Sequence, residues 1–160
     1  MKAYFAGGCF WCIASVFTSV KGVNSVTSGY SGGDEVNPKY EDVKAQKTGH
    51  RETIYIDYDE SLISYQKLLE IFLSNVDIHD SEGQFIDKGH SYTLAIYYVD
   101  DIQKEIATKR LNEYKETVFV SVEKIKVFYN AEDYHQNYHL KHPEEFKEEL
   151  INSGRLKKNS

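Results

Sequence analysis

The chain carries its two cysteines, Cys9 and Cys12, directly after the glycine pair Gly7-Gly8. A thiol attacks as its thiolate, and a cysteine at the start of a helix faces unpaired backbone N–H groups and the positive end of the helix dipole. A disulfide across so short a loop would restrict the unfolded chain by only about 2 kcal/mol. For these two cysteines, redox or nucleophilic chemistry is therefore favoured over a structural disulfide. The alternative is that they are a pair of buried, inert thiols.

The carboxylate of Glu52 is the next candidate for a role in chemistry. Ile54, Ile56 and Tyr58 alternate as expected for a strand with one buried face, and Glu52 shares their even-numbered phase. A carboxyl group beside apolar surface keeps its proton to higher pH, which is what a general acid requires. We therefore expect Glu52 to point toward the core. The alternative is that it lies at the frayed first residue of the strand and faces water.

Two of the thirteen tyrosines lie where loops deliver side chains to a site. Tyr40 follows the turn at Asn37-Pro38, and Tyr92 closes a long polar loop at residues 77–90. A connection of that length usually has a function or is disordered, and we favour a function. Packing in a sheet or core, with the hydroxyl at the surface, is the alternative for each tyrosine.

The cysteines and two histidines match a zinc pattern, Cys9-x2-Cys12 followed by His135-x3-His139. More than a hundred residues separate the two halves, unlike the short spacer of a zinc finger. We therefore expect His135 and His139 on a helix surface or at a helix end, and we predict neither a metal nor another cofactor.

The composition limits the classes of function. With 160 residues, 41% of them hydrophobic, we expect one domain over residues 1–160, with a charged helical tail from about residue 144. A net charge of −6 opposes nucleic-acid binding, and we expect Arg155, Lys157 and Lys158 to form a solvated tail. There is no apolar run long enough to span a membrane, and residues 1–6 are too short for the apolar part of a signal peptide. We expect a cytoplasmic protein, with no membrane or nucleic-acid partner.

Hydrophobic periodicity predicts alternating strands and helices. We expect strands at 2–6, 23–30, 51–58, 92–99 and 118–129, helices over 13–20, 65–76 and 102–114 with Asp101 as a cap, and mostly helix from Glu132. Strand, helix, strand, strand, helix, strand is the order of a split βαβ unit. The predicted fold is α+β, a ferredoxin-like α/β sandwich with a mainly antiparallel sheet, packed helices and a βαββαβ core.

Five motifs occur in a recognisable order. They are Gly8-Cys9-Phe10-Trp11, Gly29-Tyr30-Ser31-Gly32-Gly33, Asn37-Pro38-Lys39-Tyr40, Gly49-His50-Arg51-Glu52 and Tyr129-Asn130-Ala131-Glu132-Asp133-Tyr134-His135-Gln136. From about Phe5 to His142 the chain resembles the peptide methionine sulfoxide reductase A family. The fold of that family is the same α+β sandwich.

The resemblance implies thiol-dependent reduction of the S epimer of methionine sulfoxide, free or within proteins. It identifies Cys9 as the nucleophile, which becomes a sulfenic acid, and Glu52 as the acid on the sulfoxide oxygen. The other residues that it implies either wall the pocket for the substrate methyl group or hold its oxygen: Phe10 and Trp11 in the first role, Tyr40, Tyr92 and Asp87 in the second.

The chain departs from the family in recycling and in one loop. Many members carry recycling cysteines in a C-terminal tail, whereas this chain has none after Cys12. We expect Cys12 to resolve the sulfenic acid, and thioredoxin or another thiol reductant to reduce the disulfide. The family commonly has a glycine between Gln84 and Asp87, but this chain has Phe85-Ile86, and Asp77-Ile78 replaces the usual Asp-Pro. These changes fall in the loop that carries Asp87.

Two other classes of function are open. A thioredoxin-like thiol-disulfide oxidoreductase also has Cys-x-x-Cys after a strand. The two prolines of this chain, Pro38 and Pro143, do not form its Cys-Gly-Pro-Cys turn. A small metal-binding module built on cysteines and histidines is the alternative from a non-enzyme class.

Overall fold

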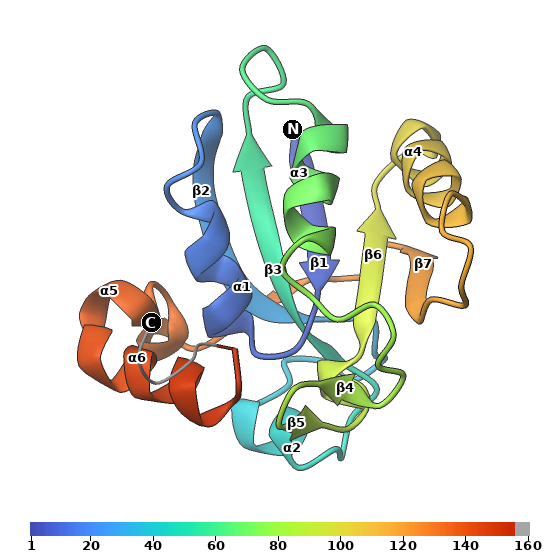
Figure 1. Cartoon of the computed structure of the whole chain (residues 1–160). Coiled ribbons are helices and arrows are strands. Elements are labelled where there is room, and N and C mark those ends of the chain that lie inside the picture. Colours follow the sequence, from blue (N-terminus) through green and yellow to red (C-terminus); the bar gives the residue numbers. More distant parts are fainter. Residues whose placement is uncertain (156–160) are drawn as a thin grey trace.

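A computed structural model describes residues 1–155, and its centre is a six-stranded sheet (Figure 1). The strands lie in the order β7-β6-β1-β3-β2-β8, with β7 parallel to β6 and every other pair antiparallel. Their bounds are β1 Lys2–Ala6, β2 Val23–Ser31, β3 Arg51–Tyr58, β6 Leu94–Tyr98, β7 Val120–Lys124 and β8 Tyr129–Asn130.

The four inner strands confirm the predicted ferredoxin-like core. Helix α1 (Phe10–Phe17) connects β1 with β2, and α3 (Tyr65–Leu73) connects β3 with β6. The resulting order β6-β1-β3-β2 is that of a βαββαβ unit in which each helix crosses one face of an antiparallel sheet. β7 and β8 extend this core at its two edges.

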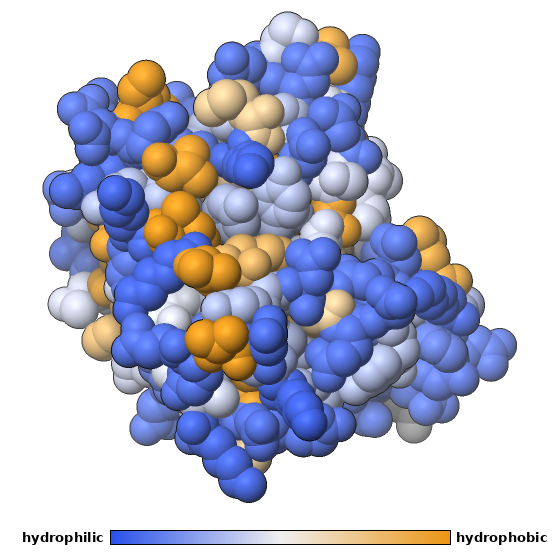
Figure 2. Space-filling model, turned by 180° about the vertical axis from the view of Figure 1, so that it is seen from behind, coloured by the Kyte–Doolittle hydropathy of each residue, from blue (hydrophilic) through white to orange (hydrophobic). Residues whose placement is uncertain are grey.

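Helices α1 and α3 cover one face of the sheet (Figure 1) and bury the main core. Leu68, Leu69 and Phe72 share one side of α3, as their spacing predicts, and all three are fully buried. Phe72 stacks on Phe5 of β1 with their ring centroids 4.7 Å apart. Figure 2 shows the molecule from behind, where hydrophobic side chains are separated by polar ones. The packing of α1 and α3 on the sheet holds the end of β1 beside the start of α1.

Several predicted boundaries are wrong. Helix α1 spans Phe10–Phe17 instead of 13–20, and α3 spans Tyr65–Leu73 instead of 65–76. Helix α4 spans Asp101–Asn112, and its N-cap is Asp100, whose carboxylate accepts a hydrogen bond from the Gln103 N–H at 2.9 Å. The strand expected at 118–129 is divided into β7 and β8, because the chain leaves one edge of the sheet after β7 and joins the opposite edge. Tyr92 precedes β6 and ends a short 3-10 helix, η1 (His90–Tyr92).

Several short elements gather where β1 ends and α1 begins (Figure 1). They are α2 (Tyr40–Lys44), the hairpin β4 (Gly83–Gln84) and β5 (Asp87–Lys88) inside the predicted long loop, η2 (Asp133–His135), α5 (Tyr138–Lys141) and α6 (Pro143–Asn152). The predicted helical C-terminal region is confirmed over α5 and α6, whereas α2 was not predicted. No helix in residues 1–155 is both long and apolar enough to cross a membrane.

Candidate active site

The turn after β1 places both cysteines on the first turn of α1. Gly8 has a φ of +77°, in the left-handed region that favours glycine. Cys9 is the N-cap of α1, and its carbonyl oxygen accepts hydrogen bonds from the N–H groups of Cys12 and Ile13 at 3.1 and 3.3 Å. Both cysteines are free thiols. The first turn of the helix therefore presents one thiol at its start and the second thiol three residues further on.

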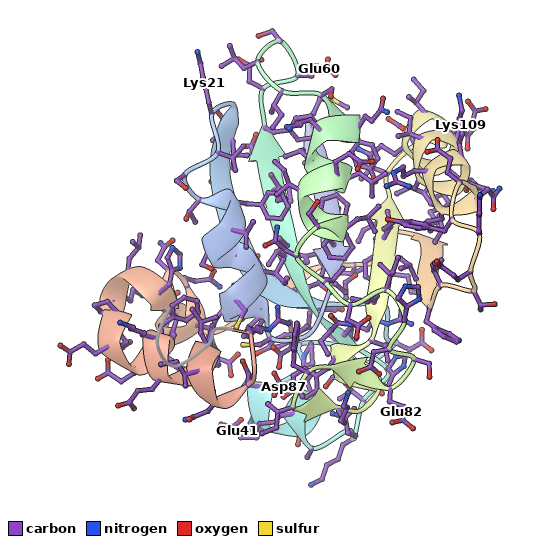
Figure 3. The ribbon with its side chains drawn as sticks, in the orientation of Figure 1. Lys21, Glu41, Glu60, Glu82, Asp87 and Lys109 are labelled. Atoms are coloured by element: carbon purple, nitrogen blue, oxygen red, sulfur yellow. The ribbon has the colours of Figure 1, made fainter. Side chains whose placement is uncertain are left out.

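A small cavity of about 50 Å³ brings together seven of the eight site residues that the sequence predicts. It is lined by Cys9, Trp11, Cys12, Tyr40, Glu52, Asp87 and Tyr92, and by Lys44, Glu149 and Ser153, which the sequence did not indicate. In Figure 3, the labelled Asp87 lies on the same side of the molecule as the start of α1, where sulfur atoms are drawn in yellow. Phe10 lies behind the lining and packs on Tyr40, with ring centroids 6.1 Å apart. It therefore supports the wall of the cavity from the core side.

Glu52 points into the core, as its strand phase predicts, and only 2% of it is exposed. Its Oε1 accepts a hydrogen bond from the Phe10 N–H at 3.1 Å. Its Oε2 is buried and has no hydrogen-bond partner among residues 1–155. Burial raises the pKa of Glu52 to about 8. The carboxyl group is therefore protonated at neutral pH and has one oxygen free to donate that proton.

Tyr40 and Tyr92 line the same cavity from α2 and η1. Burial is the main cause that raises the pKa of each phenol, and the carboxyl of Glu52 adds to the effect. Both hydroxyls are therefore neutral donors across the physiological pH range. The main-chain N–H of Tyr40 donates to Glu132 Oε2 at 3.2 Å, which fixes the first residue of α2.

The hairpin β4–β5 keeps Asp87 at the cavity despite the missing glycine in its loop. Phe85 takes the left-handed conformation itself, with a φ of +54°. For a residue with a Cβ this conformation costs about 1 to 2 kcal/mol. Burial raises the pKa of Asp87, and the nearby charges of Arg155 and Lys44 oppose the rise. Asp87 thus lines the cavity although the loop before it lacks the glycine that is common in the family.

Cys9 is a protonated thiol in the free protein, contrary to what its place at a helix start suggests. Its hydrogen bond to Cys12 raises the pKa of Cys9 well above the ordinary value, and burial and the Glu52 carboxyl add to this. The first N–H of α1, on Phe10, donates to Glu52 instead of to the sulfur. Its place at the helix start therefore does not favour a thiolate on Cys9 in the free protein.

His135 is the last residue of η2, so it lies at a helix end, one of the two positions predicted for it, but its side chain is buried and not on a helix surface. Its Nδ1 accepts a hydrogen bond from Trp11 Nε1 at 3.0 Å, and its ring lies 4.2 Å from that of Tyr40 between centroids. Burial lowers the pKa of His135, so the ring is neutral and Nδ1 is free to accept. His139 is within hydrogen-bond distance of Thr18, at 3.1 Å. In residues 1–155 no group of histidine, cysteine and acidic side chains is placed to hold a metal ion.

We expect His135→Phe to raise the KM for the substrate that the resemblance implies, methionine sulfoxide, and to change kcat little. The variant keeps an aromatic ring against Tyr40 but leaves the Trp11 N–H without its acceptor, at a cost of about 1 to 3 kcal/mol. A rise in KM of about tenfold corresponds to 1.4 kcal/mol. Steady-state kinetics measure it, and the fluorescence of Trp11, the one tryptophan of the chain, follows substrate binding directly. His139→Phe is the matched control, and an equal effect there would exclude the role of His135.

Comparison with known proteins identifies the family. The sequence model of the family described as peptide methionine sulfoxide reductase matches residues 1–160. The peptide methionine sulfoxide reductase MsrA of Bacillus licheniformis is 45% identical over 159 residues, which cover 96% of this chain and 88% of that protein. Reduced Mxr1 of Saccharomyces cerevisiae superposes with a TM-score of 0.82 at 25% identity, covering 90% of this chain and 86% of its own.

A second solved structure supports the same assignment. Methionine sulfoxide reductase A of Corynebacterium diphtheriae has a TM-score of 0.80 at 25% identity, covering 89% of this chain and 74% of its own. Fold, sequence and the order of the motifs therefore point to the same family. The chain belongs to the peptide methionine sulfoxide reductase family.

Proposed function

We propose that this protein reduces the S epimer of methionine sulfoxide, free or in oxidised proteins, with Cys9 as the nucleophile and Glu52 as the acid. The observation that carries the proposal is a protonated, buried carboxyl group in the same small cavity as a thiol. The sulfoxide oxygen leaves poorly until a proton and hydrogen bonds meet its developing charge. Glu52 supplies the proton, and Tyr40 and Tyr92 supply the hydrogen bonds.

In the first step the Cys9 sulfur attacks the sulfoxide sulfur while Glu52 protonates the oxygen. The bond between the two sulfurs then breaks as the oxygen passes from the substrate sulfur to Cys9, so the substrate S–O bond is lost and the S–O bond of a sulfenic acid is formed on Cys9. Two electrons pass from Cys9 to the substrate sulfur, which leaves as methionine. The proton that Cys9 loses restores the acid form of Glu52, so the step consumes no proton overall.

The walls of the cavity give the choice of epimer. Trp11 forms an apolar wall, backed by Phe10, whereas Glu52, Tyr40, Tyr92 and Asp87 form the polar side. A substrate with its methyl group on Trp11 and its oxygen on the polar side presents its sulfur to Cys9 in one configuration only. The cavity has little space, so it takes the side chain of an oxidised methionine and leaves the rest of the peptide outside.

Regeneration uses the second thiol. Cys12 attacks the sulfenic acid of Cys9 and forms a disulfide, which thioredoxin or another thiol reductant reduces. A structure of Mxr1 from Saccharomyces cerevisiae in complex with Trx2 has this fold. Because the cycle requires a steady supply of reducing thiols, we place the protein in the cytoplasm.

Single-turnover peptide mapping tests the regeneration step. We expect one equivalent of the sulfoxide, without reductant, to leave wild type with a Cys9–Cys12 disulfide and Cys12→Ser with a sulfenic acid on Cys9 that dimedone traps. Both proteins release the same amount of methionine in this turnover, which is the internal control. With thioredoxin as the reductant, we expect Cys12→Ser to turn over at least about tenfold more slowly. A lasting sulfenic acid in wild type, with Cys12 still free, would overturn the role of Cys12.

A further inference from the structure

The end of α6 turns back toward the cysteines instead of leaving the protein as a solvated tail. The Ser153 N–H donates to the Glu149 carbonyl at 2.9 Å, and the Gly154 N–H to the Ile151 carbonyl at 3.1 Å. Gly154 has a φ of +88°, the left-handed conformation that commonly ends a helix. The expectation of a solvated tail is therefore wrong for Arg155, and Lys157 and Lys158 lie outside the described residues.

Arg155 is fixed against the turn that carries the cysteines. Its Nη2 donates to the Gly7 carbonyl oxygen at 3.4 Å, two residues before Cys9. Its guanidinium carbon lies 4.5 Å from the centre of the Phe85 ring, within the range of a cation–π contact. Its Nε is buried and has no hydrogen-bond partner among residues 1–155. The guanidinium has thus exchanged part of its hydration for a position between β4–β5 and the start of α1.

Cys12 shares a second cavity with this guanidinium. The cavity has a volume of about 400 Å³, and Cys12 and Arg155 both contribute to its wall. Only 5% of Cys12 is exposed, and burial opposes formation of a thiolate. The titratable and charged groups that face the Cys12 sulfur or line its two cavities are Cys9, Tyr40, Lys44, Glu52, Asp77, Asp87, Tyr92, Glu149 and Arg155.

We propose that Arg155 is a positioning residue for regeneration, whose guanidinium stabilises the thiolate of Cys12 as it attacks the Cys9 sulfenic acid. The inference rests on the proposed role of Cys12. In this step an S–S bond forms and the S–O bond of Cys9 breaks. Cys12 is oxidised and Cys9 is reduced by one electron each, and the hydroxide that leaves takes up the proton that Cys12 has lost, giving water.

The charges around Cys12 support this assignment. The hydrogen bond from the Cys9 thiol lowers the pKa of Cys12, burial raises it, and the charge of Arg155 lowers it. The carboxylates of Asp87 and Glu149 act in the opposite direction to Arg155. The first step converts the Cys9 thiol to a sulfenic acid, so the S–H group that donates this hydrogen bond is gone when Cys12 attacks. Arg155 keeps its charge throughout, because a guanidinium does not deprotonate in proteins.

Rapid-quench single turnovers between pH 6 and pH 10 separate the two steps. One readout is the methionine released, which reports attack by Cys9, and the other is the loss of the Cys12 thiol, which reports the disulfide. For Arg155→Met we expect disulfide formation to slow by about tenfold at pH 7 and its midpoint to move up by about one pH unit. Methionine release should stay within about twofold of wild type.

Two further variants distinguish an effect of the Arg155 charge from an effect on the fold. Arg155→Lys keeps the charge and should restore most of the rate of disulfide formation, whereas Lys147→Met removes an exposed charge from α6 and should match wild type. Equal rates and pH midpoints in wild type and Arg155→Met would overturn the inference and leave the role of Cys12 intact. Equal slowing of both steps, or failure of lysine to rescue, would also overturn it. Absence of any disulfide in wild type would instead remove the role of Cys12.

Discussion

Replacing Cys9 with serine is expected to lower kcat/KM for methionine sulfoxide by more than about a thousandfold. A hydroxyl at this position is a poor nucleophile toward sulfur and cannot hold the oxygen as a sulfenic acid. The assay is reduction of racemic N-acetylated methionine sulfoxide with dithiothreitol, with the two epimers separated by chiral chromatography. Wild type should consume the S epimer alone, and Cys9→Ser should consume neither.

Cys12→Ser is the matched control for this loss. Dithiothreitol can reduce a sulfenic acid on Cys9 directly, so the second cysteine is dispensable in this assay. Activity that survives in Cys9→Ser would exclude Cys9 as the nucleophile. Consumption of both epimers by wild type would contradict the placing of the methyl group on Trp11. Consumption of neither by wild type would contradict the proposed reaction itself.

The fold could be predicted because its elements are encoded locally. The alternation of Ile54, Ile56 and Tyr58 and the helical spacing of Leu68 and Phe72 are each visible within one segment, and these residues are buried as expected. The break between β7 and β8 could not be predicted in this way. Both strands lie in a segment of strand-forming residues, and only the partner edges of the sheet decide where the chain turns away.

Residues of the candidate site could be predicted where the signal lies within one segment of the sequence or in a motif. Contacts between residues that are far apart in the sequence could not be predicted. The phase of Glu52 placed its carboxyl group in the core correctly. The hydrogen bond between Trp11 and His135 joins residues 124 positions apart, so no local sequence pattern indicates it. Arg155 looked like part of a basic tail, because its contacts with Gly7 and Phe85 form only when α6 packs beside the cysteines.

Glu52→Gln is expected to lower kcat/KM by about a hundredfold to a thousandfold, the range for loss of a general acid. Glutamine has the same shape, and its carbonyl oxygen can still accept from the Phe10 N–H, so the start of α1 keeps its support. What the variant loses is the proton for the sulfoxide oxygen. Asp57→Asn, an exchange of the same kind on the same strand but outside the cavity, is the matched control.

The pH dependence identifies the acid itself. Because the folded pKa of Glu52 is about 8, its protonated form is complete well below pH 8 and is lost as the pH rises through 8. Cys9 titrates in both proteins, so the shared part of its contribution cancels in the ratio of kcat/KM for wild type to that for Glu52→Gln. The Glu52 carboxylate raises the pKa of Cys9 in wild type only, which lowers the ratio further as Glu52 ionises. We expect this ratio to be constant below pH 7 and to fall tenfold per unit above about pH 8. A ratio that stays constant through pH 9.5 would mean that Glu52 acts through its shape and hydrogen bond, and that the proton comes from Tyr40 or Tyr92.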